Sequence, residues 1–384
     1  MNNKKMLFFG FAGSQCITLL ALPILTRLYD PLLFGEYNYF ITIVTTVAFF
    51  FCFRLNLKIQ IVNKEAIKNK IVLKSYMLLA LTTILATSIY CYFSGFTIGL
   101  IYFMIVIVFL SLYEIHTDYY SSNKSYKKIA IANILRATTV ILFQIMFYKY
   151  EHGLFIGFIV GLIFSQILIF KLIKVRCSDF EGIKKSEFVF MVKNSLISSV
   201  NIVGLNLPLI IIYNQLDAEI AGIYSLADKL IFAGIVICTN VFSRLIYNDL
   251  KEQAQAKVLK DWICKIVILA TIIIIVSMFI SEFAIETAFG VKWSLSANVF
   301  IALLPWMTIQ LIMIPFTCAL IYNGKEWYLL NVEILKNISR ISVLMLCLYL
   351  NYDLVNIILA SSIIPLVFGI AIISYGLYKN EIIN

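Results

Sequence analysis

The sequence predicts an all-α membrane protein with about twelve transmembrane helices, and two observations support this prediction. Of its 384 residues, 61% are hydrophobic and only 14% are charged, whereas a soluble domain is about 45–50% apolar and about 25% charged. Runs of about 20 apolar residues, the length needed to cross a bilayer, recur along the whole chain. The polar stretches between them are too short to fold by themselves.

Each apolar run is assigned one predicted transmembrane span. The first run follows Lys4 and Lys5, as in a signal peptide. It continues to Leu28 without a small-residue cleavage site, so we expect it to be retained as a span. The predicted spans are 7–28, 36–61, 75–93, 98–121, 127–148, 153–173, 189–213, 219–246, 262–281, 295–322, 328–349 and 353–378.

The distribution of Lys and Arg orients these spans. Of 31 such residues, 23 fall in the termini, loops and adjoining span ends on one side, five lie deeper inside spans, and three (Arg27, Lys149 and Lys292) fall on the other side. Cytoplasmic loops carry an excess of Lys and Arg. We therefore expect both termini in the cytoplasm and an even number of spans. The same rule explains the net charge of +10 without a nucleic-acid partner.

The cysteines do not suggest a disulfide framework or a metal site. Eight cysteines are scattered singly, mostly within apolar runs, and the chain has two histidines and no CxxC motif. Metal sites and disulfide frameworks show characteristic Cys spacings that are missing here. We expect the cysteines to act as small buried hydrophobic residues.

The sequence contains a short internal repeat. DPLLFGEY at 30–37 and DAEIAGIY at 217–224 share the pattern D-x4-G-x-Y at an offset of 187 residues, close to half the chain. Both copies precede an even-numbered span, which predicts a parallel repeat with substrate bound between the halves. We expect the Gly to form a tight turn at a helix entry and the acid to suit a helix N-terminus. Capped turns without a further role explain the pattern equally well. The paired residues are Asp30 and Asp217, Gly35 and Gly222, and Tyr37 and Tyr224.

The stretch PILTRLYDPLLFGEYNYF (23–40) resembles the signature P-x-x-T-R-x-Y-x-P-x-x-F-G-x-Y of polysaccharide flippases. These Wzx-like proteins export O-antigen and capsule repeat units and belong to the multidrug/oligosaccharidyl-lipid/polysaccharide (MOP) superfamily. AGIYSLADKL (221–230) resembles the second-half entry of the family, and FGVKW (289–293) resembles an outer loop before its tenth span. The matching signature residues are Pro23, Thr26, Arg27, Tyr29, Pro31, Phe34, Gly35 and Tyr37.

This resemblance implies a MATE-like fold of two six-helix bundles, which we expect at 1–185 and 186–384. It also implies a cargo, an undecaprenyl-diphosphate-linked oligosaccharide. The cargo would be moved by alternating access across the inner membrane, for lipopolysaccharide O-antigen or capsule assembly. The expected coupling ion is H⁺ or Na⁺, with no other cofactor. The expected partners are the bilayer, a glycan polymerase and a chain-length regulator.

Charged residues inside the predicted spans are candidates for the cargo site, because ionisable groups at membrane depth are costly and mark function. Arg can bind phosphate oxygens with both arms of its planar fork. Glu333, Lys336, Asn337 and Arg340 have helical spacing that places them on one stripe. The candidate cargo-binding residues are Arg27, Arg54, Arg136, Lys229, Lys336 and Arg340, of which Arg27, Arg54 and Arg340 rank first.

Glu114, Asp118 and Asp228 are candidates for binding the coupling ion. The competing interpretation is that the charges pair within the protein. Glu114 or Asp118 would then pair with Arg136 or Arg54, and Glu333 would pair with Lys336.

Two other functions compete with the flippase. A multidrug or metabolite cation antiporter of the same superfamily would favour an acidic cavity, but the spans hold five cations against four acids. A membrane glycan polymerase would need a sizeable outer loop, and the largest predicted one, 282–294, is short. The sequence shows no nucleophile triad, nucleotide motif or P-loop, so we predict that the protein is not an enzyme.

Overall fold

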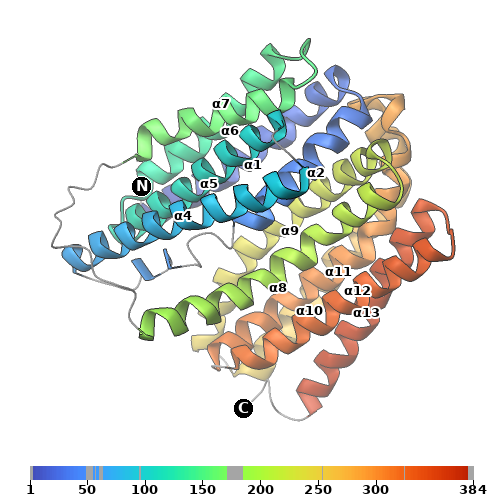
Figure 1. Cartoon of the computed structure of the whole chain (residues 1–384). Helices are drawn as coiled ribbons and strands as arrows, with labels where there is room; N and C mark the ends of the chain where they lie inside the picture. Colours follow the sequence, from blue (N-terminus) through green and yellow to red (C-terminus); the bar gives the residue numbers. More distant parts are fainter. Residues whose placement is uncertain are drawn as a thin grey trace. The chain divides into compact units, whose positions relative to one another are not determined.

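The structure, a computed structural model, describes residues 3–48, 55–56, 58–59, 64–94, 97–170, 185–252, 254–323 and 325–378 (Figure 1). Within these ranges it contains twelve α-helices, one short 3₁₀ helix and no strand, which confirms the predicted all-α class. The elements are α1 (Asn3–Leu28), α2 (Pro31–Ala48), α4 (Glu65–Ser94), α5 (Ile98–Ser122), α6 (Tyr126–Met146), α7 (Gly153–Ile169), α8 (Lys185–Gln215), α9 (Ala218–Glu252), α10 (Gln255–Phe289), η3 (Val291–Trp293), α11 (Leu295–Tyr322), α12 (Glu326–Tyr349) and α13 (Leu354–Tyr378).

Most of these helices have the length and composition of membrane spans. Among the described residues, seven are long and apolar enough to cross a bilayer, and two further apolar segments are shorter. Helix α12 falls outside both groups, and its stripe of Glu333, Lys336 and Arg340 is one reason. The chain is therefore a multi-pass membrane protein with a charged stripe on one of its helices.

Several predicted boundaries are wrong. The predicted span 36–61 is not one helix, because α2 runs from Pro31 to Ala48 and Leu55 lies in a turn. The predicted outer loop 282–294 is mostly helical, since α10 continues to Phe289 and η3 follows. Apolar runs mark only the part of a helix that crosses the bilayer, and backbone hydrogen bonding continues into the polar residues beyond it.

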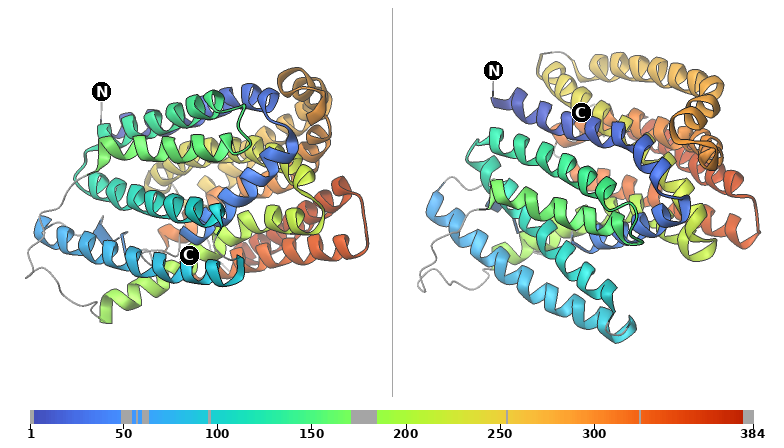
Figure 2. Two further views of the ribbon diagram at one scale, coloured as in Figure 1. Left: turned by 45° about the horizontal axis from the view of Figure 1, so that its top comes forward. Right: turned by 90° about the horizontal axis from the view of Figure 1, so that it is seen from above.

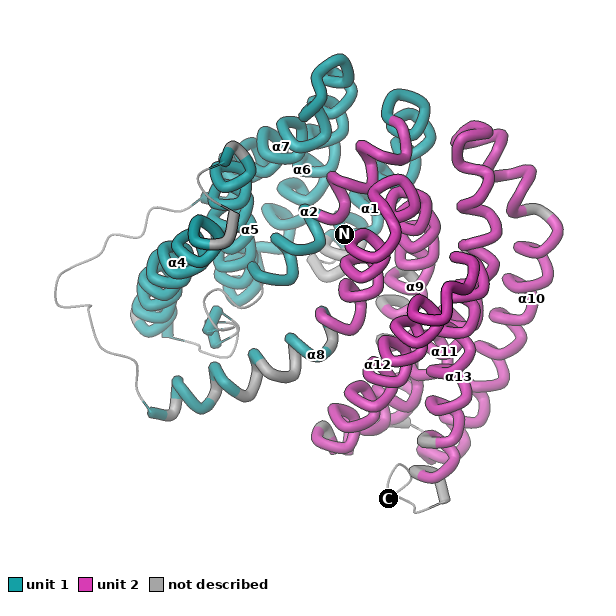
Figure 3. Tube along the Cα trace, turned by 45° about the vertical axis from the view of Figure 1, so that its right-hand side comes forward, with its two compact units in different colours: residues 1–29, 40–202 teal, residues 30–39, 203–384 magenta. Residues whose placement is uncertain are grey.

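The helices group into two compact units, coloured separately in Figure 3. Unit 1 comprises Met1–Tyr29 and Phe40–Ile202, and unit 2 comprises Asp30–Tyr39 and Val203–Asn384. The start of α2, which carries the DPLLFGEY motif, therefore belongs with the second half of the chain. The predicted bundles at 1–185 and 186–384 stay a prediction.

Unit 1 depends on close packing of α7 against α6, and the two helices lie side by side in both views of Figure 2. A Cβ atom added to Gly157 would overlap the backbone of Gln144, and one added to Gly161 would overlap the backbone of Val140. Small residues let membrane helices approach this closely. Tyr29 fixes the end of α1 to the same pair of helices, because its hydroxyl donates to the Gln144 carbonyl at 2.7 Å.

The start of α8 is held within unit 1 by a buried ion pair. The Glu187 carboxylate accepts from Lys74 Nζ at 2.9 Å and from Lys58 Nζ at 3.3 Å. The side chains of Glu187 and Lys74 are only 7% and 6% exposed. Removing one partner of a buried pair leaves the other charge without compensation.

Unit 2 is built around α11, which is buried along most of its length and packs against α9, α10 and α13. Its core side chains include Val299, Leu303, Ile309 and Leu311. This central helix also carries Trp306, which is 2% exposed. The Trp306 ring contacts charged residues of α12.

We expect Glu187→Gln to destabilise the folded protein by about 3–5 kcal/mol, because it leaves the buried Lys74 unpaired. The control is Asp30→Asn, which breaks a pair with Lys292 whose side chains are 63% and 70% exposed. An exposed pair contributes about 0–1 kcal/mol. Chemical or thermal unfolding of the purified protein in detergent measures both changes, and equal losses in the two variants would contradict the assignment.

Candidate functional site

The two copies of the sequence repeat meet in unit 2, where the start of α2 crosses α9. A Cβ atom on Gly35 would overlap the Ala218 carbonyl oxygen and approach the Gly222 nitrogen. A Cβ atom on Gly222 would overlap the Pro31 carbonyl oxygen. Both glycines lie inside helices, so the predicted tight turn is wrong. Their physical role is to let two backbones touch at one crossing.

The acids of the repeat have different roles. Asp217 Oδ1 accepts the backbone N–H of Ile220 at 2.7 Å, which confirms the predicted helix cap. Asp30 instead pairs with Lys292 Nζ at 2.5 Å on the surface of unit 2. Lys292 belongs to the FGVKW segment, so this pair links two sequence motifs.

Trp293 of the same segment packs directly against the first motif. Its side chain is fully buried, and the Phe34 ring meets it edge-on with ring centroids 5.3 Å apart. Phe34 is itself 1% exposed. The stretches 30–39, 217–229 and 289–293, which are far apart in the chain, therefore form one packed cluster in unit 2.

Lys229 extends from α9 into this cluster. Its Nζ donates to Asn38 Oδ1 at 2.5 Å and lies 4.5 Å from the centroid of the Phe34 ring. Asn38 is held in turn by its own donation to Ser225 Oγ at 2.9 Å. The same Nζ lies 5.7 Å from the centroid of the Tyr37 ring. A cation over an aromatic face is stabilised most when it is shielded from water, so one amide and two rings hold Lys229.

Asn38 is a residue that the sequence analysis missed. Asn38 and Ser225 are separated by 187 residues, the same offset as the D-x4-G-x-Y repeat. Extending the repeat by one position on each copy would have paired these two polar side chains. The offset of the repeat therefore already indicated that Asn38 and Ser225 lie together, although the two residue types differ.

Helix α12 supplies two buried cations of unit 2. Lys336 is fully buried and Arg340 is 1% exposed, so the predicted stripe faces the interior of the unit. Lys336 Nζ pairs with the Glu333 carboxylate at 2.6 Å and lies 3.5 Å from Gln310 Oε1. This confirms the predicted pairing of Glu333 with Lys336.

Arg340 is held differently, by a ring and a hydroxyl. Its guanidinium carbon lies 4.0 Å from the centroid of the Trp306 ring, and its Nη2 donates to the Tyr224 hydroxyl at 3.2 Å. The repeat tyrosine of the second half therefore positions Arg340. Among the residues that the structure describes, Arg340 Nε has no hydrogen-bond partner.

These residues form what we call the cation cluster: Asp228, Lys229, Glu333, Lys336 and Arg340. Asp228 interacts electrostatically with both Arg340 and Lys229. Three cations and two acids give the cluster a charge of +1 when all five groups are ionised. A buried donor without an acceptor costs about 1–3 kcal/mol, and more when the group is charged. The cluster is therefore suited to accept an anionic oxygen at Arg340.

The remaining predicted charges lie in unit 1. The guanidinium carbon of Arg136 lies 4.5 Å from the centroid of the Tyr113 ring. Asp118 Oδ2 accepts a hydrogen bond from Asn56 Nδ2 at 2.6 Å. Glu114 is half-buried on α5, and Arg27 is exposed in the last turn of α1. Arg54 lies outside the described residues.

The first part of the signature has local structural roles in unit 1. Pro23 lies inside α1, and the Thr26 hydroxyl donates to the Leu22 carbonyl at 2.9 Å. Tyr29 bonds to α6 as described above. Pro31 is different, because it begins α2 in unit 2 and its fixed φ suits the first helical position.

Two residues that contact the cation cluster were also missed by the sequence analysis. Trp306 and Gln310 lie on α11, one turn apart, and both contact the cations of α12. Trp306 follows Pro305 within an apolar run, and nothing in that run distinguishes a ring under a cation from an ordinary core ring. Gln310 is a polar side chain in that run, and its presence in an apolar helix could have indicated a buried polar partner.

The helix crossing gives a direct test. We expect Gly222→Val to lower the thermal stability strongly, because the added side chain overlaps the backbone of α2; overpacking costs about 1–3 kcal/mol where neighbours can shift. Gly234→Val in the same helix is the control, since a Cβ atom there meets nothing within 4 Å. Melting temperatures in detergent compare the two. A similar melting temperature for both variants would contradict the proposed crossing.

No family model matches the chain. It is 23% identical over 313 residues to the "Capsular polysaccharide biosynthesis protein CapF" of Staphylococcus aureus, covering 76% of this chain and 78% of that protein.

Solved structures are similar over nearly the whole chain. The lipid II flippase MurJ in an inward closed conformation has a TM-score of 0.75 at 13% identity, covering 97% of this chain and 87% of that one. An inward-facing multidrug resistance MATE family transporter of the MOP superfamily has a TM-score of 0.70 at 12% identity, covering 96% and 94%. The chain therefore has the helical fold that these transporters share, as its sequence predicted.

Proposed function

We propose that this protein is a flippase that moves an undecaprenyl-diphosphate-linked oligosaccharide from the cytoplasmic to the outer leaflet of a bacterial cytoplasmic membrane. The observation that carries the proposal is the cation cluster, which has a net charge of +1 when all five of its groups are ionised. It contains the buried Arg340, whose Nε has no hydrogen-bond partner among the described residues. The likeness to CapF, a capsular polysaccharide biosynthesis protein, supports a role in capsule assembly. The likeness in fold to a lipid II flippase supports a lipid-linked cargo.

In this proposal Arg340 binds the diphosphate of the cargo. Trp306 fixes the plane of the guanidinium, and Tyr224 holds Nη2, so the group is oriented before the cargo arrives. A planar guanidinium binds phosphate oxygens with two parallel hydrogen bonds. A preorganised donor loses little entropy on binding, which favours binding at this position.

The other members of the cluster have distinct proposed roles. Glu333 partly neutralises the charge of Lys336. In this proposal Lys336 contributes positive electrostatic potential to the site and makes no direct contact with the cargo. Lys229 is fixed by Asn38 and adds a second cation. Asp228, like Glu114 and Asp118 in unit 1, is proposed to bind the coupling H⁺ or Na⁺. The termini are proposed to face the cytoplasm, and a polymerase and chain-length regulator are proposed partners.

A cation antiporter is the second candidate, because the MATE transporters share the fold. The net positive cluster disfavours a cationic substrate, since like charges repel at close range in a site shielded from water. We therefore rank the antiporter below the flippase. We propose no enzymatic activity.

The first test is deletion of the gene in its host, with the lipid-linked and surface glycans examined together. We expect single repeat units to accumulate on undecaprenyl diphosphate facing the cytoplasm, and surface polymer to disappear. Single units on the surface without polymer would instead identify a polymerase. Unchanged glycan with altered drug tolerance would identify an antiporter.

Complementation of this deletion tests Arg340. We expect Arg340→Ala to weaken cargo binding by about 10–100-fold, because a hydrogen bond to a charged group contributes about 1.5–3 kcal/mol. Arg340→Lys keeps the charge but loses the planar fork, so partial recovery is expected. Lys292→Ala removes an exposed cation of the same unit and serves as the control. Full surface polymer with Arg340→Ala would contradict the proposed contact.

Asp228→Asn and Glu114→Gln test ion coupling. We expect at least one of the two to abolish the dependence of transport on pH or Na⁺, because a carboxylate that binds the ion is lost. Flipping in proteoliposomes under imposed H⁺ or Na⁺ gradients measures this dependence. Unchanged ion dependence in both variants would exclude these carboxyl groups as the coupling site.

A further inference from the structure

A second short repeat relates one helix of unit 1 to one helix of unit 2. NILR at 133–136 and NISR at 337–340 share the pattern N-I-x-R and lie on α6 and α12, which are the fifth and eleventh predicted spans. Their offset of 204 residues exceeds that of the first repeat in part because α10 and α11, with 35 and 28 residues, are longer than α4 and α5, with 30 and 25. The repeat therefore pairs Arg136 with Arg340.

The contacts of the two arginines support this pairing. The guanidinium carbon of Arg136 lies 4.5 Å from the centroid of the Tyr113 ring on α5, and that of Arg340 lies 4.0 Å from the centroid of the Trp306 ring on α11. Tyr113 and Trp306 are 6% and 2% exposed. Helices α5 and α11 correspond to the fourth and tenth predicted spans, so each unit places its arginine over a ring of the preceding span.

The guanidinium of Arg136 has no hydrogen bond or ion pair among the residues that the structure describes. In particular, it forms no ion pair with Glu114 or Asp118. Arg136 lies ten residues after the start of α6, about 15 Å along the helix, near the middle of the span Tyr126–Met146. A cation at this depth faces the interior of the protein or a water-filled cavity and marks function. The five N–H donors of Arg136 are therefore available to a ligand.

Asn133 adds a second available donor one turn earlier on the same face of α6. It is 2% exposed, and its Oδ1 accepts a hydrogen bond from the Tyr113 hydroxyl. Within the described ranges its Nδ2 has no hydrogen-bond partner. Tyr113 thus holds both groups, since its hydroxyl bonds to Asn133 and its ring lies under Arg136.

These donors suit an anionic ligand with several oxygen atoms. Arg136 supplies a positive charge and a planar fork that binds phosphate oxygens bidentately, and Asn133 supplies a neutral N–H donor. A cation would be repelled by Arg136. A sugar hydroxyl could accept from either group but would leave the charge of Arg136 without compensation. A phosphate satisfies both the charge and the free donors.

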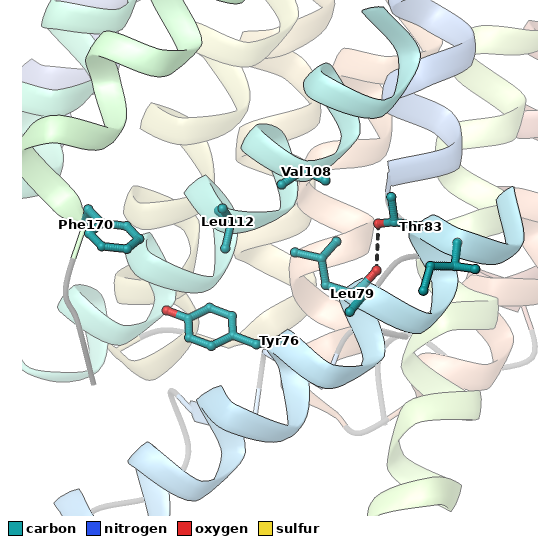
Figure 4. Close-up of a pocket in the computed structure, with 8 residues that line it drawn as sticks. Tyr76, Leu79, Thr83, Val108, Leu112 and Phe170 are labelled. Atoms are coloured by element: carbon teal, nitrogen blue, oxygen red, sulfur yellow. Dashed lines mark hydrogen bonds between the residues drawn. The ribbon is translucent and has the colours of Figure 1, made fainter. Parts of the chain in front are cut away.

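The apolar groove between α4 and α5 in the same unit offers a phosphate no such partners (Figure 4). Its volume is about 490 Å³, and no charged side chain lines it. Its two hydroxyl groups are already bonded: Thr83 Oγ1 donates to the Leu79 carbonyl at 2.6 Å (Figure 4), and the Tyr76 hydroxyl bonds to His116 Nε2 at 2.8 Å. A phosphate placed there would lose its hydration without finding a donor.

We propose that Asn133 and Arg136 form a second phosphate-binding site, in unit 1, for the diphosphate of the lipid-linked cargo. This inference rests on the proposed function, which assigns the diphosphate to Arg340 in unit 2. Both sites use a guanidinium that an aromatic ring of the preceding span holds in place. Each unit can then bind the anionic part of the cargo by itself.

Binding of a short-chain prenyl diphosphate to the purified full-length protein in detergent tests the proposal. Native mass spectrometry counts the bound molecules, and titration calorimetry measures their affinity. We expect two molecules per wild-type chain, and one each for Arg136→Ala and Arg340→Ala. In the Arg340→Ala background, Arg136→Ala is expected to weaken the remaining site by about 10–100-fold, because hydrogen bonds to a charged group are lost. Lys149→Ala removes an exposed cation of unit 1 and is the control, with two molecules still bound.

Asn133→Asp keeps the test valid if Arg136→Ala does not fold. Aspartate retains an oxygen that accepts from the Tyr113 hydroxyl, but it replaces the free N–H donor with a negative charge. We expect this variant to melt near the wild-type temperature and to bind the diphosphate in unit 1 about ten-fold more weakly or worse, because like charges repel. Unchanged binding of two molecules by folded Asn133→Asp would overturn the proposal.

The other outcomes separate this inference from the proposed function. A single bound diphosphate that is lost in Arg340→Ala and unchanged in Arg136→Ala would overturn this inference alone. A single one that both variants weaken would also overturn it, because the chain would then have one shared site. Equal competition by phosphatidylglycerol at the unit 1 site would identify it as a site for bilayer head groups and overturn its assignment to the cargo. No diphosphate binding by the wild-type protein would overturn the proposed function as well.

Discussion

The contact between Gly35 and Gly222 is the constraint on which the arrangement of the candidate site depends. Only two residues without a Cβ atom allow the backbones of α2 and α9 to touch. This contact places Phe34 and Asn38, which flank Gly35 on α2, beside Lys229, which lies about two turns after Gly222 on α9. With side chains at the crossing the helices would separate, and Lys229 would lose both its ring and its amide oxygen.

Burial of cations in unit 2 has an energetic cost that the surrounding residues offset in three ways. Lys336 has a carboxylate partner, Lys229 has an amide oxygen and an aromatic face, and Arg340 has a ring and a hydroxyl. Arg tolerates such a site better than Lys, because its charge is delocalised and more weakly hydrated. Arg340, which also interacts electrostatically with Asp228, keeps an Nε without a hydrogen-bond partner among the described residues, and it is the cation of the cluster best able to bind an anionic ligand.

The sequence predicted the fold class and the buried stripe of α12, because hydropathy and helical spacing are local properties. It also located the repeat, but it assigned the glycines to turns. A glycine at a turn and a glycine at a helix crossing look alike in one sequence, since the partner backbone lies 187 residues away. The aromatic partner of Arg340 was missed for a similar reason. In the sequence Trp306 looks like any other apolar core residue, and only the tertiary contact shows that its ring lies under the Arg340 guanidinium.

The signature residues indicate the fold more directly than they indicate the cargo. Thr26 and Tyr29 bond to backbone carbonyls, Pro31 begins a helix, and Gly35 allows a crossing. Each of these tasks concerns the backbone and would be needed whatever the protein carries. The buried cations of unit 2, whose chemistry suits an anionic ligand, lie on α9 and α12, outside that signature. Differences in cargo between proteins of this fold should therefore be sought along the buried faces of those helices, where a changed charge alters the site without disturbing the crossing.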